Sequence, residues 1–309
     1  MRILATMVLL WAVSARGELA HLPGAFGGVG LGARASGLGG AYVVLTEGPD
    51  AAVWNPAGLV GARGREFLFS TTRQFGLVPY HMFLYGDQLL GYPVAVGVRT
   101  AGDAALREHT LLFGGAGIIG GEVASGVTAK VYYATFGGNP EGRWVAGGAD
   151  RQVRGSAYGF GLDVGFRGQL GTGMAWAVVM RDLLSWVRYD ASNGAGTAEG
   201  GGEAVPAQAW LGLGFWAGGG TLFEVDIHKA LYRDQRDRVF FGVERLVFGR
   251  LALRGGMSQD LEAEHNRMLS AGFGMEFHAG PFPMGVDVAY VSTELGDSFH
   301  FSLRWTGGK

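Results

Sequence analysis

The strongest constraint on the fold is a period of two in hydropathy, which recurs in segments of about ten residues from Gly64 to Trp305. In the last segment, SFHFSLRW (298–305), every second residue is aromatic or aliphatic and the others are polar. Such a segment predicts a β-strand, because successive side chains of a strand point to opposite faces of the sheet. The chain holds roughly fourteen such segments, so it is predicted to be all-β.

The connections between these segments alternate in length. Four long polar connections, 137–154, 183–205, 230–236 and 259–265, fall on alternate links, and short turns such as GQLG (168–171) fall on the others. Long loops at one rim, tight turns at the other and an even strand count are typical of an outer-membrane barrel. The sequence therefore predicts a closed antiparallel transmembrane β-barrel of about 14 strands.

A soluble β-sandwich or propeller would also have strands with one apolar face. About fourteen strands are many for a single sandwich, however, and no blade-length repeat is present. The apolar faces are also aromatic and aliphatic from strand to strand, as contact with lipid requires. A closed barrel gives every backbone N–H and C=O a partner without leaving a sheet edge in the hydrocarbon, so these points favour the barrel.

Residues 1–17, MRILATMVLLWAVSARG, have the organisation of a secretory signal peptide. Arg2 precedes a mostly apolar run at 3–13, and small residues follow it. The run is short for a bilayer span, which needs about 20 residues, and the alternative to a signal is a buried N-terminal helix. We expect export to the outer membrane of a diderm bacterium. The formal net charge of −2 gives no electrostatic footprint for nucleic acid.

Residues 18–63 have no steady helical or strand period and are rich in Gly and other small residues. Within them, Asn55 and Pro56 suit the N-cap and first position of a short helix, and Asp50 can cap the preceding AAVW turn. A compact irregular segment with few long side chains is suited to a narrow lumen. We therefore expect a hatch, or plug, at 18–63, followed by the barrel at 64–309.

Opposite their lipid-facing residues, the strands carry charges of both signs, which the alternation directs into the lumen. An unpaired charge facing the bilayer midplane would cost about 2–4 kcal/mol, so this placement supports the assigned faces. The charges could line a water-filled path or form a mutually neutralising network that closes the barrel, and the balance of signs favours the network. The expected lumen charge network consists of Asp163, Arg181, Glu224, Asp226, Glu244, Arg254, Glu276, Asp287 and Arg304.

The stretch GARASGLGGAYVVLTEGPDAAVWNPAGL (32–59) resembles the N-terminal signature of FadL-like outer-membrane barrels, and most closely that of their shorter PorV/PorQ-type branch. In that branch an Arg and a Gly-Gly-Ala run lead through an acidic turn to a Trp/Tyr-Asn-Pro-Ala-Gly-Leu motif. Similar stretches follow at 159–166 (GFGLDVGF) and 269–277 (LSAGFGMEF). The residues that the resemblance assigns to the hatch are Arg34, Gly39, Gly40, Asp50, Asn55, Pro56, Ala57 and Gly58.

The resemblance implies a barrel with its N-terminal segment folded into the lumen. FadL-like members pass long-chain fatty acids or other hydrophobic molecules, which implies passive transport of hydrophobic or amphiphilic small molecules across the outer membrane. PorV-type members act in type IX protein secretion, which implies the alternative of a secretion shuttle or attachment platform for exported proteins. The expected partners are outer-membrane lipid, a hydrophobic small molecule or an exported protein, and the barrel assembly machinery during biogenesis.

The connection at 183–205 would carry recognition if the chain were a platform. It holds Trp186 and Tyr189 ahead of a Gly-, Ala- and Glu-rich tract, and aromatic residues on the loops of a rigid scaffold are suitable anchors. The same two residues would also suit the aromatic girdle at the membrane interface.

Enzyme motifs are weak throughout the chain. The G-x-G-x-x-A match at 28–33 follows no strand and opens no βαβ unit, and the GDSF stretch at 296–299 lies where a turn needs Gly and Asp. The seven His residues show no metal-binding spacing, and Cys is absent. No catalytic residue, metal or cofactor is therefore expected.

Overall fold

The computed structural model describes residues 30–62, 64–137, 154–193, 197–231, 236–261 and 266–307. The predicted signal peptide, residues 18–29 and 63 of the predicted hatch, and most of the predicted connections at 137–154, 230–236 and 259–265 lie outside the described residues. Within the part of the chain that is described, no helix is long and apolar enough to cross a membrane.

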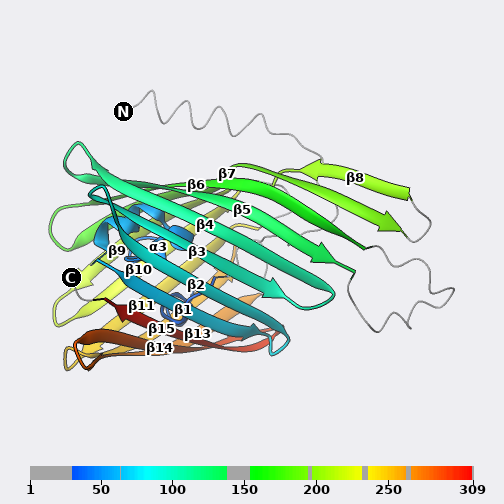
Figure 1. Ribbon diagram of the computed structural model, residues 1–309. Coiled ribbons are helices and arrows are strands. Elements are labelled where there is room, and N and C mark those ends of the chain that lie inside the picture. The colour runs from blue at the N-terminus through cyan, green and yellow to red at the C-terminus, as the bar shows by residue number, and fades with distance from the viewer. Residues whose placement is uncertain are drawn as a thin grey trace.

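Fourteen strands, β1–β7 and β9–β15, form a closed antiparallel ring (Figure 1). The ring closes because β1 pairs with β15 and β7 pairs with both β6 and β9. The prediction of a closed barrel of about 14 strands is confirmed. The strands are β1 (Glu66–Gln74), β2 (Val78–Leu89), β3 (Tyr92–Gly102), β4 (Leu106–Ile119), β5 (Val123–Phe136), β6 (Arg154–Gln169), β7 (Met174–Asn193), β8 (Thr197–Glu203), β9 (Gln208–Ala217), β10 (Thr221–Ala230), β11 (Arg238–Val247), β12 (Leu251–Asp260), β13 (Arg267–Ala279), β14 (Phe282–Thr293) and β15 (Gly296–Thr306).

Inward and outward residues alternate along the strands. In β4, Phe113 is 51% exposed and its neighbour Leu112 is 3% exposed; in β5, Val131 is 46% exposed and Lys130 is 9% exposed. Across the middle of the strands, apolar side chains therefore cover the outside of the ring and charged ones turn into the lumen. A closed antiparallel ring with this exterior is an outer-membrane β-barrel. The rim with the longer connections is the extracellular one in such barrels, and the rim with the tight turns is periplasmic.

The prediction of a loop at 183–205 is wrong. β7 continues to Asn193, and β8 returns beside it, paired with β7 alone. The β7–β8 hairpin projects beyond the ring (Figure 1). Trp186 and Tyr189 therefore lie on a strand. The Gly-rich sequence of β8 has low strand propensity, and the strand forms because β7 supplies a partner for it.

β7 bends where it leaves β9. Its pairing with β9 ends at Arg181, and its register with β6 shifts between Leu162 and Val164. Asp182 has a φ of 52°, a left-handed conformation that is uncommon outside Gly. The register shift marks a β-bulge, in which one strand has more residues than its partner. A β-bulge bends the strand and changes the direction of its side chains.

Residues 30–62, here called the N-terminal segment, lie inside the ring. The segment contains α2 (Ala33–Gly37), α3 (Ala51–Trp54) and the 3-10 helix η1 (Pro56–Gly61). α2 contacts β12–β15, and η1 contacts β3–β6, so the segment reaches across the lumen.

The two predicted helix caps in this segment differ in outcome. Asn55 caps η1 as expected, because its Oδ1 accepts a hydrogen bond from the Ala57 amide at 3.1 Å. Asp50 precedes α3 but makes no side-chain cap, and that prediction is wrong. The Asp50 Oδ2 instead accepts a hydrogen bond, at 2.9 Å, from the buried Tyr42 hydroxyl. Without Asp50 this buried hydroxyl would lack an acceptor.

The N-terminal segment and the barrel wall touch backbone to backbone at Gly39 and Gly256. A Cβ atom on Gly256 would overlap the Gly39 nitrogen and the Leu38 carbonyl carbon. A Cβ atom on the adjacent Gly255 would lie no closer than 3.7 Å to its nearest neighbour, which is Val243 Cγ1. The absence of a side chain at Gly256 therefore lets the segment lie against β12.

We expect Gly256→Val to destabilise the packed segment by about 1–3 kcal/mol, because the added side chain forces the two backbones apart. Gly255→Val is the matched control, since it adds the same atoms on the other face of the strand. Limited proteolysis of the folded protein in detergent measures the effect. Cleavage within residues 30–62 should accelerate in Gly256→Val, and equal rates in the two variants would contradict the close packing.

Candidate functional site

Two carboxylates on β10 hold the backbone of the N-terminal segment. The two oxygens of Glu224 accept hydrogen bonds from the amides of residues 44 and 45, at 2.6 and 3.1 Å. Asp226 Oδ2 accepts from the amides of residues 42 and 43, at 2.8 and 3.1 Å. Both carboxylates are buried. They supply the acceptors that water would otherwise give to these irregular amides.

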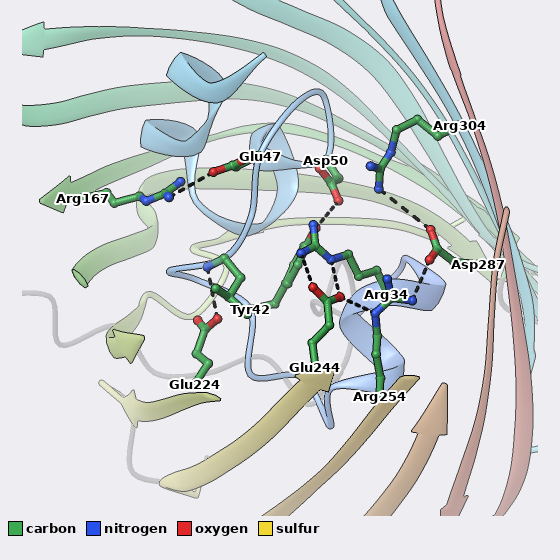
Figure 2. A network of polar contacts seen from close by, with 11 residues as sticks. Arg34, Tyr42, Glu47, Asp50, Arg167, Glu224, Glu244, Arg254, Asp287 and Arg304 are labelled. Atoms are coloured by element: carbon green, nitrogen blue, oxygen red, sulfur yellow. Dashed lines mark hydrogen bonds and ion pairs between the residues drawn. The ribbon is translucent and has the colours of Figure 1, made fainter. Parts of the chain in front are cut away.

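A chain of five charged residues joins the segment to the wall formed by β11, β12, β14 and β15 (Figure 2). Arg34 of α2 forms a two-bond ion pair with Glu244, at 2.9 and 3.0 Å. Arg254 contacts both Glu244 and Asp287 at 2.6 Å, and Arg304 lies 3.9 Å from Asp287. Four of the five were expected in the lumen network, and the fifth, Arg34, was assigned to the hatch. The structure thus brings the two predicted sets together.

A second polar cluster surrounds the bend in β7. Lys130 Nζ lies 2.7 Å from Asp163 Oδ1 and 2.9 Å from Asp182 Oδ1, and the Tyr132 hydroxyl donates to Asp182. The Asp182 amide donates to Asp163 Oδ1 at 2.8 Å. The expected network contained Asp163 but missed Asp182. The bend turns Asp182 inward, out of the alternation from which the network was predicted.

Arg181 and Glu276 lie apart from these two groups. The Arg181 guanidinium lies between the rings of Trp54 and Trp210, 5.2 and 4.6 Å from their centroids, and donates to the Trp54 carbonyl at 2.8 Å. Glu276 lines the periplasmic end of the lumen and has no ion pair with any described residue. The nine predicted charges therefore form several local groups.

The two predicted recognition residues have different environments. Trp186 points outward, is half exposed and covers Gly202 of β8. Tyr189 packs against an inward cluster that includes Val187 and Val205. Of these two residues, only Trp186 is thus available to a partner on the outside of the hairpin.

A cavity of 620 Å³ occupies the extracellular half of the lumen, directly above the N-terminal segment. Its apolar lining includes Trp54, Trp210, Phe240, Met268 and Val291. Polar and charged residues, among them Arg181, His228 and Arg238, make up the rest of the lining, so the cavity is amphiphilic. Its size is that of small-molecule sites.

Three buried nitrogen atoms of residues that line this cavity have no hydrogen-bond partner within the described part of the protein. Arg181 Nε, Trp210 Nε1 and His228 Nε2 are buried and have no hydrogen-bond partner among the described residues. All three residues line the cavity.

A smaller cavity of 330 Å³ opens toward the periplasmic rim. It is polar, and its lining includes Arg34, Glu47, Glu244 and Arg304. The N-terminal segment separates it from the extracellular cavity. Of the described residues, no group of three or more His, Asp or Glu side chains is arranged to hold a metal ion.

Asp226→Asn should loosen the N-terminal segment locally. A neutral acceptor makes weaker hydrogen bonds than a carboxylate by about 1 kcal/mol each, so the two bonds together predict roughly 30-fold faster amide exchange at residues 42 and 43. Hydrogen exchange read by mass spectrometry measures this. Glu276→Gln is the control, because that carboxylate holds no part of the segment. Unchanged protection in Asp226→Asn would contradict the role assigned to β10.

Asp50 makes the stability of the segment depend on pH. Burial raises the pKa of the Asp50 carboxyl above its ordinary value, against the opposing effects of Arg304, the Tyr42 hydrogen bond and Arg34. Between the unfolded pKa of about 4 and this raised value, the folded protein binds more protons than the unfolded chain. Stability should therefore fall as pH rises through that window.

Asp50→Asn should make this fall in stability shallower, because Asn carries no charge and its side-chain oxygen can still accept from Tyr42. The thermal midpoint in detergent, measured from about pH 4 upward, checks the prediction. Asp103→Asn, in the exposed β3–β4 turn, is the control. Parallel pH profiles for Asp50→Asn and the unmodified protein would count against it.

No protein-family model matches the sequence, and no curated protein matches it either. Solved structures do match. The toluene transporter TodX of Pseudomonas putida has a TM-score of 0.59 and 14% identity, with 88% of this chain and 95% of that chain covered. The toluene transporter TbuX of Ralstonia pickettii has a TM-score of 0.59 and 12% identity, with 89% and 97% covered.

A FadL homologue of Pseudomonas aeruginosa has a TM-score of 0.62 and 11% identity, with 90% of this chain and 98% of that chain covered. The TM-scores establish a shared architecture, and identities this low do not identify the cargo. The chain has the barrel fold of these FadL-type transporters, over nearly the whole length of each.

Proposed function

We propose that this protein is a passive outer-membrane channel for hydrophobic or amphiphilic small molecules. The observation that carries the proposal is the 620 Å³ extracellular cavity, whose lining combines aromatic and aliphatic residues with polar and charged ones. TodX and TbuX, which have the same fold, are described as toluene transporters, and this supports the same class of cargo here. No catalytic step is part of the proposal.

The N-terminal segment sets the condition for passage. It is held by the β10 carboxylates and by the Arg34–Glu244 ion pair, and it separates the two cavities. A molecule in the extracellular cavity therefore reaches the periplasm only when part of this segment moves. The segment acts as the hatch that the resemblance implies.

Filling the cavity should stop uptake. Val291 is inward, buried and part of the cavity lining, so Val291→Trp places a large ring in the space that cargo needs. Val286→Trp adds the same ring to the outward face of the same strand. The measurement is entry of labelled toluene and of a long-chain fatty acid into proteoliposomes, with sucrose as a hydrophilic comparison.

For at least one hydrophobic probe, uptake by Val286→Trp should equal that of the unmodified protein. Uptake of the same probe by Val291→Trp should fall to the protein-free level. Sucrose should not enter in any case. If no hydrophobic probe enters above the protein-free level in the unmodified protein, the transport proposal fails.

A second candidate function rests on the β7–β8 hairpin. The hairpin projects beyond the ring and presents Trp186 outward, which is the kind of surface that a PorV/PorQ-type attachment platform for exported proteins would use. Under this alternative, Trp186→Ala would abolish capture of an exported protein and leave small-molecule uptake unchanged.

A further inference from the structure

A groove of 740 Å³ crosses the outside of the barrel over β13, β14, β15, β1 and β2. Two rows of outward side chains, which follow the hydrogen-bonding register from strand to strand, form its walls. One row is Phe273, Val288, Phe301, Thr71 and His81, and the other is Ala271, Tyr290, Phe299, Arg73 and Pro79.

The floor of the groove is backbone. The residues between the two rows, which include Gly272 and Ala289, belong to the inward face, so their side chains do not fill the space. Ala271 is the smallest residue of either wall. The groove is therefore a continuous depression in the outer surface.

The groove is apolar at one end and polar at the other. Over β13–β15 its walls are mainly Phe, Val and Tyr, and over β1 and β2 they change to Thr71, Arg73 and His81. This distribution is that of a site for an amphiphile whose charged end lies at β1.

A basic patch continues from this polar end across the next strands. Arg73 and Arg107 point outward in the same row, separated on β2 and β3 by the small residues Pro79 and Gly102. Three strand spacings put the two arginines about 14 Å apart. His81 and His109 lie in the adjacent outward row, each with its Nδ1 bonded to a Thr hydroxyl, at 2.9 and 3.1 Å.

These two arginines differ from other outward cations near the same rim. Lys229 is paired with Asp237, and Arg188 with Asp190. The side chains of Arg73 and Arg107 have no hydrogen-bond or ion-pair partner among the described residues. Two unpaired cations on one face indicate an anionic ligand that is external to the barrel wall.

The position of the patch identifies the kind of anion. Arg73 is the last residue but one of β1, and Arg107 is the second residue of β4, both next to the extracellular rim. This is the level of the head groups in the outer leaflet, while the Phe and Val end of the groove lies against the hydrocarbon. A bound ligand there must have an acyl chain and a negatively charged head group.

We propose that this face of the barrel is a binding site for a phosphorylated, multiply acylated lipid of the outer leaflet. One acyl chain lies in the groove between the two side-chain rows. Phosphate groups contact Arg73 and Arg107, whose separation suits a head group that bears more than one phosphate. The site is independent of the lumen, so it stands whether or not the channel function does.

Native mass spectrometry of the full barrel, purified in a nonionic detergent, tests the proposal. The probes are a diphosphorylated lipid A and its dephosphorylated form, and free inorganic phosphate serves as a competitor that separates head-group charge from lipid. The unmodified protein should retain diphosphorylated lipid A at least about tenfold better than the dephosphorylated form, because two charged contacts are lost with the phosphates. Inorganic phosphate should compete weakly, because it lacks the acyl chains.

Two variants and two controls locate the site. Arg73→Gln/Arg107→Gln should reduce retention to that of the dephosphorylated lipid, and Ala271→Phe, which fills the groove, should weaken both lipids. Arg245→Gln removes an outward arginine near the periplasmic rim, and Leu211→Phe enlarges an outward residue on β9; both should bind as the unmodified protein does. Heat-dependent gel mobility confirms that each variant is folded.

Equal retention of the two lipids, or unchanged binding in the double arginine variant, would overturn the proposal. So would a lipid-free dimer that Ala271→Phe dissociates, since the groove would then belong to a second copy of the chain.

Discussion

Every polar group of a backbone that lies inside a membrane needs a partner within the protein, and this requirement governs the whole molecule. The strands meet it by closing into a ring in which β1 pairs with β15 and β7 with β9. Strand geometry alternates the side chains, and closure turns one face toward lipid, where apolar residues lie, and the other toward the lumen, where charged residues lie. The charged interior is thus a consequence of how the wall satisfies its own hydrogen bonds.

The N-terminal segment poses the same problem inside the lumen, where its irregular backbone has no ladder to join. Side chains of the barrel wall supply the hydrogen-bond acceptors. Glu224 and Asp226 accept hydrogen bonds from four successive amides, and Ser302 accepts one from the Ala33 amide at 2.8 Å. Several of the lumen acids therefore serve backbone groups rather than basic side chains. This explains why a lumen with balanced charges does not form one continuous ion-pair network.

The sequence predicted the barrel well, because each strand carries its own alternation and needs no knowledge of distant residues. The Asn55 cap of η1 was equally predictable from the sequence, since the capping residue and the amide that donates to it are two positions apart. The bend at Asp182 and the strand β8 were missed. Asp182 turns inward only because the register of β7 shifts against β6, and β8 is a Gly-rich stretch that becomes a strand only by pairing with β7.

The candidate site was predictable only in part, for a related reason. The alternation identifies the strand charges that face the lumen, but their partners lie across the ring. The ion pair between Arg34 and Glu244 joins residues 210 positions apart, so no local sequence pattern predicts it. The same holds for Arg181 between Trp54 and Trp210, because one ring belongs to the N-terminal segment and the other to β9.

The bend in β7 also shapes the mouth of the barrel. Beyond Arg181, β7 no longer pairs with β9 and instead pairs with β6 on one side and β8 on the other. A sheet of β5, β6, β7 and β8 therefore extends above the rim on one side of the barrel (Figure 1). Among the described residues, one side of the entrance is consequently higher than the other. Large molecules in the surroundings, such as antibodies or phage proteins, would touch this sheet before they reached the bilayer.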